Sequence, residues 1–420
     1  MKKNNPIKKI RNWKRKKLIL SILFLLSIIT IFIIIKNNNN FSVQKVFPKP
    51  VGKYTVGRTQ MDYKYIASDD IEREITTVIY YPSDTDEGKK TAEYGFSEFQ
   101  EQRSRFLNDA ENAKEDKLFN PDFKTWSYEN LNVSATKEQY PVVFFSPGAG
   151  AYAEQGTVFA QDLASSGYIV VAMGHAESGV NKFLDGRVEG VSSRFIDSLS
   201  NYTSEFLDKV KFRLYIAKWK LPEKSAMKTS RMLTAAPKGI DFSKYAELQS
   251  EDISFVADNL YKMNSGEIDS IFKGRLQLDK GLGIFGHSFG GTTAAMVSRD
   301  DDRFVGSINL DGNMLGLLDS DLKKPFLQLG TVLAYNTNTF LLQTNSNDTY
   351  FAIIDGVKHG DFSDSLFTAT EKSQRGSRDA LSQRTILSTY MKGFFDKYLL
   401  KEDSNLDRLN YDGVRFFKSQ

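Results

Sequence analysis

The sequence predicts an α/β fold with a mostly parallel central sheet that helices cover on both faces. From residue 140 onward, short apolar runs alternate with segments of helical periodicity, a pattern typical of such a sheet. Alternating apolar and polar residues between positions 53 and 82 favour antiparallel strands that enter the same sheet. We find no internal repeat and no second boundary, so residues 51–420 are interpreted as one domain.

Two segments interrupt this pattern. Residues 84–138 are charged and aromatic, and we expect a helical insertion there. Residues 181–250 are the least regular stretch, and we expect this insertion to cover the site as a lid. Within it, apolar residues recur at helical spacing from Phe206 to Leu221 between basic residues, with Trp219 beside them. This pattern predicts either a basic amphipathic helix that faces lipid headgroups or, as we favour, a helix that packs on the core.

A serine in a glycine-rich turn is the most informative feature of the chain. Residues 282–291 read Leu-Gly-Ile-Phe-Gly-His-Ser-Phe-Gly-Gly, an apolar strand end followed by small residues that can begin a helix close to the sheet. In such a turn the serine backbone is strained, and flanking positions need glycine because a Cβ would clash there. We therefore predict that Ser288 is a nucleophile. An ordinary structural glycine turn is the alternative.

A serine hydroxyl needs a base, and the chain has three histidines. His287 adjoins the serine, so its side chain should project away from the line of attack. His175 precedes the serine and would break the Ser–Asp–His order of this fold. His359 follows a strand-like run in a glycine-flanked loop, where such a fold places its base, so we predict that it takes the serine proton. A surface-loop histidine without a role is the alternative.

The base needs a carboxylate that orients its imidazole. Asp311 ends an apolar strand-like run at a turn, and it lies between Ser288 and His359 in the chain. In many hydrolases of this fold the acid follows the next strand, but the segment after residues 325–330 carries no acid. Asp355 is closer to His359 in sequence, yet it would lie within or just after the last strand. We favour Asp311 and keep Asp355 as the alternative.

Acyl transfer also requires hydrogen-bond donors for the oxyanion. The residue after the nucleophile, Phe289, supplies one candidate backbone N–H. The second should come from a loop after an earlier strand, and residues 140–152 read as a buried strand that ends in a glycine-rich turn. Within that turn the N–H of Ala149 is our candidate. An ordinary Gly-Pro turn is the alternative.

Taken together, these motifs resemble the platelet-activating-factor acetylhydrolase family, lipoprotein-associated phospholipases with bacterial relatives within the α/β-hydrolases. The resemblance covers most of the chain after the N-terminus. The segments that carry it are residues 51–58, 78–83, 145–152, 162–172, 174–175, 252–256, 272–276 and 286–291, with His359 and Phe362.

The resemblance implies a triad of Ser288, Asp311 and His359, oxyanion donors at Phe289 and Ala149, and esterase activity without a metal. The chain departs from the family in the oxyanion loop, which usually reads His-Gly and here reads Pro147-Gly148. Proline removes one backbone donor and stiffens the loop. Ala149 also stands where a larger apolar residue is common, which could widen the acyl pocket. Neither departure touches the triad.

The N-terminus predicts where the protein works. Nine lysines and arginines and no acid fall within residues 1–17, and residues 18–35 follow without a charge. Eighteen uncharged, mostly apolar residues nearly cross a bilayer core, and the run ends without a small-residue cleavage site or a lipobox cysteine. We interpret residues 18–35 as an uncleaved signal anchor, residues 1–17 as its cytoplasmic flank and residues 36–50 as a linker. A single-pass cell-membrane protein with its catalytic domain outside the cell is expected.

Composition narrows the function further. The net charge of +4 contains +9 from the basic flank, so the chain from residue 18 carries 4 − 9 = −5. The overall positive charge is therefore no evidence that the protein binds nucleic acid. Without cysteine the chain has no disulfide or thiolate ligand, which is compatible with the outer surface of a bacterium. Three histidines without a pair at ligand spacing make a catalytic metal improbable, and we expect no cofactor.

We therefore expect a membrane-anchored serine esterase for short or modified acyl esters, with phospholipids as the substrate that the resemblance suggests. A general carboxylesterase or polyester-type hydrolase for small extracellular esters is the competing hypothesis. A catalytically silent surface-binding protein on the same scaffold is a third hypothesis, which the three filled triad positions disfavour.

Overall fold

A computed structural model describes residues 47–95, 123–199, 243–314, 320–369 and 372–419, with the single positions 99, 102, 225, 228, 316 and 317. The basic flank, the expected anchor and most of the linker lie outside these residues, as does the helix expected between Phe206 and Leu221. None of the helices within the described ranges combines the length and apolar character needed to cross a bilayer.

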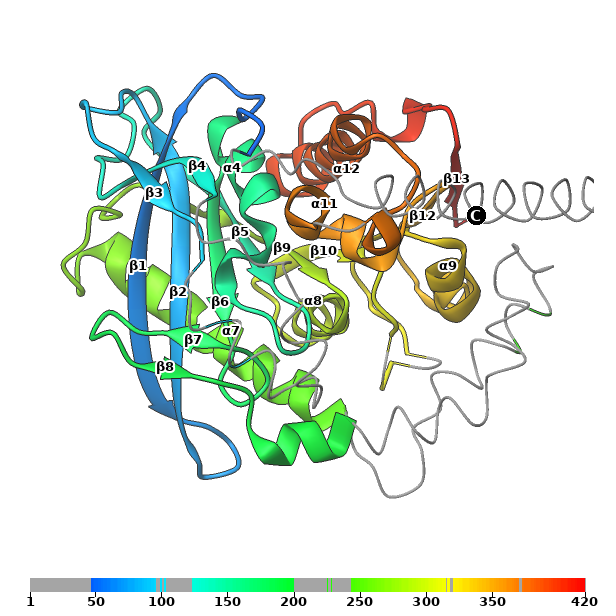
Figure 1. Cartoon of the computed structure of the whole chain (residues 1–420), viewed down its shortest axis with the longest axis horizontal. Helices are drawn as coiled ribbons and strands as arrows, with labels where there is room; N and C mark the ends of the chain where they lie inside the picture. The colour runs from blue at the N-terminus through cyan, green and yellow to red at the C-terminus, as the bar shows by residue number, and fades with distance from the viewer. Residues whose placement is uncertain are drawn as a thin grey trace, which may run out of the picture.

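An eleven-stranded sheet runs through the described part of the chain, from β3 at one edge to β13 at the other. Figure 1 shows it extending from the blue strands β1 and β2 to the red strand β13. The strand order is β13-β12-β11-β10-β9-β5-β6-β2-β1-β4-β3. The strands are β1 (Thr55–Ile66), β2 (Glu72–Ser83), β3 (Thr91–Glu93), β4 (Lys124–Glu129), β5 (Tyr140–Ser146), β6 (Ile169–Gly174), β9 (Leu276–His287), β10 (Phe304–Leu310), β11 (Phe326–Gly330), β12 (Thr349–Ile354) and β13 (Val414–Lys418).

The six central strands, from β12 to β6, are all parallel to one another. Antiparallel pairs lie outside them, where β13 joins β12 and where β2 joins β6 and β1. The long β1–β2 pair confirms the antiparallel entry strands expected from the sequence. The mixed α/β fold with a mostly parallel sheet is likewise confirmed. Because parallel strands end at one edge, the loops after β5, β9, β10, β11 and β12 meet there.

Helices lie on both faces of the sheet. They are α4 (Thr157–Ser165), α7 (Ser243–Ser265), α8 (Phe289–Asp300), α9 (Val332–Asn338), α10 (Leu341–Thr344), α11 (Ser365–Thr368) and α12 (Ala380–Phe395). The described residues also form short helices of 3-10 or π type: η1 (Ala153–Gly156), η2 (His359–Phe362), η3 (Lys372–Gln374), η4 (Asp396–Leu400) and η5 (Leu406–Arg408). Figure 1 shows α4 and α12 on one side of the central strands and α7 on the other.

Strand β5 shows how the two cores are built. Its side chains alternate between faces: Val143 and Phe145 pack with α4 and α12, whereas Val142 and Phe144 pack with α7 and α8. All four side chains are buried, because both faces of a central parallel strand are covered. At roughly 1.5–3 kcal/mol for each large apolar side chain, this double burial fixes the central strands and with them the loops at their ends.

The described residues of the two expected insertions include strands that we did not predict. The described parts of residues 84–138 contain two strands, because β3 pairs with β4 and β4 extends the sheet beside β1, and positions 99 and 102 are helical. The first part of residues 181–250 forms a small separate hairpin, β7 (Asn181–Lys182) with β8 (Val188–Glu189), and its last part begins α7. The sequence reading missed these strands because they are short and rich in charged residues. Most of the segment expected to be a lid lies outside the described residues.

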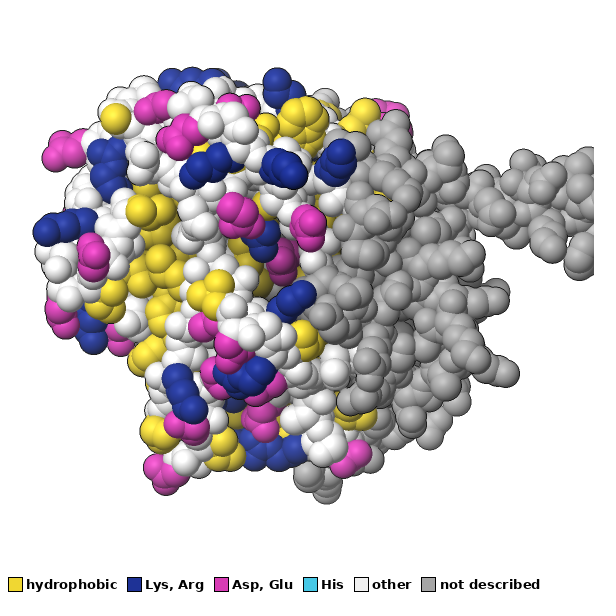
Figure 2. All heavy atoms as spheres, turned by 60° about the vertical axis from the view of Figure 1, so that its left-hand side comes forward, with side chains coloured by type: hydrophobic (Ala, Val, Ile, Leu, Met, Phe, Trp, Pro, Cys, Tyr) yellow, Lys and Arg dark blue, Asp and Glu magenta, His cyan; other side chains and the backbone are white. Residues whose placement is uncertain are grey.

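The surface beside β1 and β2 carries charges of both signs. On the coloured part of the face in Figure 2, dark blue and magenta side chains are intermixed, with apolar side chains between them. Ion pairs such as Arg187 with Glu74, 2.6 Å apart, belong to this surface. Charge of one sign is therefore not gathered into a patch there.

Candidate active site

Ser288 occupies a strained turn between β9 and α8. Its φ is 55° and its ψ −120°, a combination that a residue with a side chain rarely adopts. Glycine is required on either side: a Cβ on Gly286 would lie 2.0 Å from the carbonyl oxygen of Gly290, and one on Gly290 would lie 2.1 Å from that of Ser146. These clashes are the physical reason for the Gly-x-Ser-x-Gly pattern, and they confirm the steric argument made from the sequence.

His359 lies within hydrogen-bond reach of this serine. It is the first residue of η2, after β12, and its Nε2 is 2.9 Å from Ser288 Oγ. The imidazole is 55% exposed, so a small molecule can approach it from one side. A glycine, Gly360, follows it in the loop, as in the pattern that singled out this histidine.

Asp311 completes a hydrogen-bonded chain with these two residues. Its Oδ2 is 2.8 Å from His359 Nδ1, and its Oδ1 accepts the Thr331 N–H at 2.6 Å. Asp311 follows β10 directly and is 7% exposed. The alternative acid, Asp355, instead forms an ion pair with Arg415 at 2.6 Å. The structure therefore joins Asp311, and not Asp355, to the histidine.

The electrostatics of His359 suit a base. Withdrawal from water disfavours the charged imidazole, but the hydrogen bond to Asp311 and the charge of that carboxylate outweigh it. The pKa of His359 is consequently raised above its ordinary value of 6.5. With Nδ1–H donating to Asp311, the neutral ring presents Nε2 as an acceptor for the serine hydroxyl proton.

The loop after β5 passes beside Ser288. A Cβ on Gly148 would lie 3.2 Å from Ser288 Cβ, so this backbone runs directly beside the serine. The Gly148 N–H donates to Gln155 Oε1 at 2.8 Å, and the Gly150 N–H donates to the Ser178 carbonyl at 2.8 Å. Between them, the Ala149 N–H has no hydrogen-bond acceptor among the described residues. Phe289, the other candidate donor, is the first residue of α8, where backbone N–H groups carry partial positive charge.

Comparison with known proteins places this geometry in a family. The family model described as platelet-activating factor acetylhydrolase, isoform II, matches residues 39–230 and 245–375. The chain belongs to the platelet-activating factor acetylhydrolase family. Within the described residues, no cluster of three or more histidine and carboxylate side chains is arranged to hold a metal ion.

Individual relatives are distant. Platelet-activating factor acetylhydrolase of Canis lupus familiaris is 25% identical over 281 residues, which cover 66% of this chain and 57% of the relative. The chicken relative, from Gallus gallus, is 24% identical over 343 residues, 78% of this chain and 77% of its own length. The chain thus spans little more than half of the canine acetylhydrolase. A solved ferulic acid esterase from Streptomyces cinnamoneus aligns with a TM-score of 0.63 at 20% identity over 89% of this chain and 99% of its own, a likeness of fold.

His287 makes a contact beside Ser288, Asp311 and His359 that the sequence did not suggest. Its ring lies against that of His359 in a tilted arrangement, and its Nε2–H donates to the His359 carbonyl at 3.1 Å. Burial, with a further contribution from His359, lowers the pKa of His287 to about 3, so the ring stays neutral. The expectation that His287 points away from the serine's line of attack omitted this contact with the base, which only the fold brings close.

A buried amide network fixes the turn that carries Asp311. Asn309 Oδ1 accepts the Gly312 N–H at 2.8 Å, and its Nδ2 donates to Gln328 Oε1 at 2.7 Å. Asn338 Nδ2 donates to the Gly312 carbonyl at 2.7 Å. This network supports the positive φ of 55° at Asp311. Asparagine and glutamine in otherwise apolar strand runs were the signal in the sequence, because buried polar side chains require partners.

Proposed function

We propose that this chain is a serine esterase in which Ser288 attacks the carbonyl carbon of an ester. The observation that carries the proposal is the unbroken hydrogen-bonded chain from Ser288 through His359 to Asp311, at 2.9 and 2.8 Å. Membership of the platelet-activating factor acetylhydrolase family supports an ester as the substrate. A surface protein without catalysis would need neither the strained serine nor its hydrogen-bonded base.

Acylation begins when neutral His359 removes the Ser288 proton. The serine oxygen forms a bond to the ester carbon, and the carbonyl π electrons move onto its oxygen. Asp311 stabilises the imidazolium that results and keeps Nδ1 protonated. The tetrahedral intermediate then collapses: the bond to the alkoxy group breaks, and His359 returns its proton to the leaving alcohol. An acyl-serine and a free alcohol remain.

The oxyanion needs donors that face it before the reaction starts. We assign this role to the backbone N–H groups of Ala149 and Phe289. The available Ala149 N–H and the position of Phe289 at the start of α8 support it. In deacylation His359 takes a proton from water, the hydroxide adds to the acyl carbon, and the same donors hold the second oxyanion. Ser288 leaves as an alcohol when it regains the proton.

The substrate class we propose is short or modified acyl esters, phospholipids among them. The relatives from Canis lupus familiaris and Gallus gallus are named for hydrolysis of the acetyl group of platelet-activating factor, and this supports a short acyl chain on a glycerophospholipid. Ala149, small where the family commonly has a larger apolar residue, is compatible with a somewhat wider pocket.

We further propose that residues 18–35 anchor the protein in the cell membrane with the catalytic domain outside. The basic flank and the uncharged run support this orientation. The absence of cysteine offers a direct test on intact cells. A membrane-impermeant maleimide should label Leu184→Cys, whose native side chain is 67% exposed, and should leave Asn4→Cys in the basic flank unlabelled. Labelling at position 4 without labelling at position 184 would contradict the orientation.

The catalytic proposal is tested by a fluorophosphonate probe, which reacts with activated serines. Wild-type protein should be labelled, and labelling should disappear in Ser288→Ala. Ser165→Ala serves as the control because Ser165 is a serine of α4 outside the Ser288–His359–Asp311 chain, and its loss should leave labelling unchanged. Folded wild-type protein without labelling would favour the silent surface protein.

Substrate class is tested separately. Initial rates on a phospholipid with a short acyl chain should exceed those on its long-chain counterpart, with both measured against a soluble p-nitrophenyl ester. Efficient cleavage of the soluble ester together with negligible phospholipid turnover would favour the general carboxylesterase instead.

A further inference from the structure

A second Ser–His–Asp arrangement lies close to the first but is buried. Ser146 Oγ is 2.9 Å from His175 Nε2, and His175 Nδ1 is 2.9 Å from Asp252 Oδ2. Exposure of the three residues is 0%, 1% and 0%. No substrate can reach this serine, so the arrangement cannot act as a second hydrolytic site.

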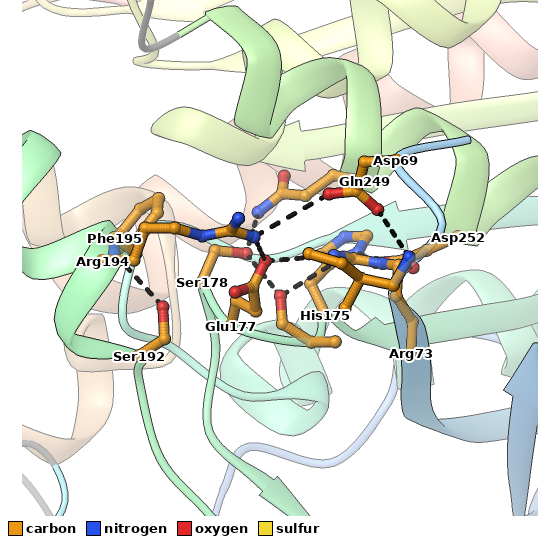
Figure 3. Close-up of polar contacts among 12 residues, drawn as sticks. Asp69, Arg73, His175, Glu177, Ser178, Ser192, Arg194, Phe195, Gln249 and Asp252 are labelled. Carbon is orange, nitrogen blue, oxygen red and sulfur yellow. Dashed lines mark hydrogen bonds and ion pairs between the residues drawn. The ribbon is translucent and has the colours of Figure 1, made fainter. Parts of the chain in front are cut away.

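The carboxylate of Asp252 is fixed from several directions. Arg73 donates from Nε to Oδ1 at 2.7 Å and from Nη2 to Oδ2 at 2.8 Å, and the Tyr65 hydroxyl donates to Oδ1 at 2.7 Å. Figure 3 shows Arg73, Asp252 and His175 gathered together, with Glu177 between Arg73 and Arg194. Glu177 pairs with Arg194 at 2.6 Å and approaches Arg73 to 3.5 Å. Two strands, a loop and α7 are thereby joined.

The protonation states of His175 and Asp252 follow from this arrangement. Burial lowers the pKa of His175, although Asp252 opposes the effect, so the imidazole is neutral. Burial raises the pKa of Asp252, but the bonds and charge of Arg73 outweigh it and the carboxyl stays ionised. An ionised Asp252 accepts from His175 Nδ1–H, which leaves Nε2 as an acceptor. The Ser146 hydroxyl therefore donates to His175, and its direction is fixed.

Ser146 is the last residue of β5, immediately before the loop that carries the Ala149 N–H. Its side chain is held by His175, and its carbonyl lies against Gly290 so closely that a Cβ there would approach to 2.1 Å. The loop after His175 holds the same segment further on, since the Ser178 carbonyl accepts the Gly150 N–H and the Val180 N–H donates to the Ala151 carbonyl. The hydrogen bond of Ser146 to His175 and that of Gly150 to Ser178 therefore lie on either side of Ala149 in the chain.

We propose that His175 is a positioning residue for the proposed esterase reaction: through Ser146 and the adjoining loop, it holds the Ala149 N–H in place for the oxyanion. The inference rests on the proposed function only for its catalytic consequence. Its structural content is that the Ser146–His175–Asp252–Arg73 chain immobilises residues 146–151. A network that served stability alone would leave that loop and the oxyanion unaffected.

The test compares two buried serines. Ser146→Ala removes the hydroxyl bonded to His175, and Ser165→Ala removes an equally buried hydroxyl that accepts the Gly52 N–H at 3.0 Å. On a soluble p-nitrophenyl ester, Ser146→Ala should lower kcat about tenfold with KM little changed, because a small misplacement of a donor is costly in the transition state. Affinity for a trifluoromethyl ketone, whose adduct places an oxyanion in the same position, should fall by the same factor. Ser165→Ala should leave both quantities close to wild type.

Hydrogen exchange separates this inference from the proposed function. The peptide that covers residues 146–152 should exchange faster in Ser146→Ala than in Ser165→Ala, whether or not the protein hydrolyses the ester. Unchanged exchange together with an unchanged kcat would overturn the inference. Wild-type protein without hydrolysis or labelling would instead overturn the proposed function.

Rescue at position 175 gives an independent test. His175→Gln places an amide oxygen where Nε2 accepts from Ser146, whereas His175→Leu removes every acceptor. His175→Gln should therefore regain part of the kcat and of the exchange protection that His175→Leu loses. Equal loss in the two variants, at equal thermal stability, would contradict a positioning role through Ser146.

Discussion

The imidazole of His287 lies against that of His359, with ring centroids 4.8 Å apart and planes tilted by 35°. His287 is the last residue of β9, and His359 is the first residue of η2, after β12. Because His287 Nε2–H donates to the His359 carbonyl, its buried Nδ1 carries no proton, and this atom has no hydrogen-bond partner in the described structure. The residue before the proposed nucleophile thus supports the loop that carries the proposed base.

Replacing His287 should weaken the pH dependence of stability. In the folded protein burial lowers the pKa of His287 to about 3, from an ordinary value of 6.5. Between these values the unfolded chain binds a proton that the folded protein does not. The free energy of unfolding should therefore fall as the pH drops below 6.5, by up to about 1.4 kcal/mol per pH unit from this group. Urea unfolding of wild type and His287→Gln at pH 7, 5 and 4 measures the difference, and parallel pH dependences would contradict it.

Activity should fall on the acidic side as His359 becomes protonated. The pKa of His359 is raised by Asp311, so the midpoint of the kcat/KM profile should lie above 6.5. In Asp311→Asn the carboxylate that raises the pKa of His359 is lost, whereas burial, which lowers this pKa, remains. The midpoint should therefore move below that of wild type. The rate should also fall by about four orders of magnitude, as for the equivalent change in other Ser–His–Asp enzymes. A profile with the same midpoint in both variants would show that another group controls it.

Glycine substitutions should show whether the turn around Ser288 requires glycine because a Cβ would clash there. Gly290→Ala would press a Cβ against the Ser146 carbonyl at 2.1 Å, so it should displace the turn around Ser288 and abolish fluorophosphonate labelling. Gly393→Ala, within α12, is the control: its Cβ would lie 3.7 Å from Leu406 and Ser404, an ordinary contact distance. Alanine also favours helix by about 1 kcal/mol over glycine, so this variant should label normally and gain thermal stability. Normal labelling of Gly290→Ala would refute the steric argument.

A buried ion pair between α4 and α12 should contribute to the stability of the protein and not to its catalytic rate. Arg384 Nε donates to Asp162 Oδ2 at 2.9 Å, with 8% and 2% of the two side chains exposed. Arg384→Met leaves the carboxylate buried with fewer donors and should lower the free energy of unfolding by roughly 3–5 kcal/mol. Adding Asp162→Asn should restore part of that loss. Chemical denaturation with a parallel kcat measurement checks both statements, and a fall in kcat at full folding would contradict them.

The sequence predicted the parts of the site that depend on chain order and local strain. Ser288, Asp311 and His359 could be named because a strained serine turn demands glycines and because each of the other two follows a strand. Their hydrogen-bonded chain is what the structure adds. The sequence could not show why Asn309 and Gln328 are polar, since their partnership exists only when β10 lies beside β11. His175 was set aside as a base because it precedes Ser288 in the chain, and its contact with Ser146 went unseen because only the fold brings these two side chains together.

The amide network under the acid turn yields a final prediction. Asn309 holds both the N–H and the carbonyl of Gly312, and a Cβ on Gly312 would lie 2.0 Å from the Ser288 carbonyl. The acid turn and the nucleophile turn are therefore in direct contact. Asn309→Ala leaves buried amide groups unpaired and should cost about 1–3 kcal/mol of stability. It should also lower kcat/KM, because Asp311 loses the support for its positive φ.

Asn345→Ala is the matched control for this change. Asn345 is also buried, and its Nδ2 donates to the Lys324 carbonyl at 3.0 Å and to Thr349 Oγ1 at 2.8 Å, in the loop before β12. Its loss should lower the unfolding free energy by a similar amount and leave kcat/KM near wild type. If both variants lost activity only in proportion to the unfolded fraction, the network would be a stabilising feature without influence on the acid. A selective fall in kcat/KM for Asn309→Ala, measured well below its melting temperature, is expected because only Asn309 orients the turn that aims Asp311 at His359.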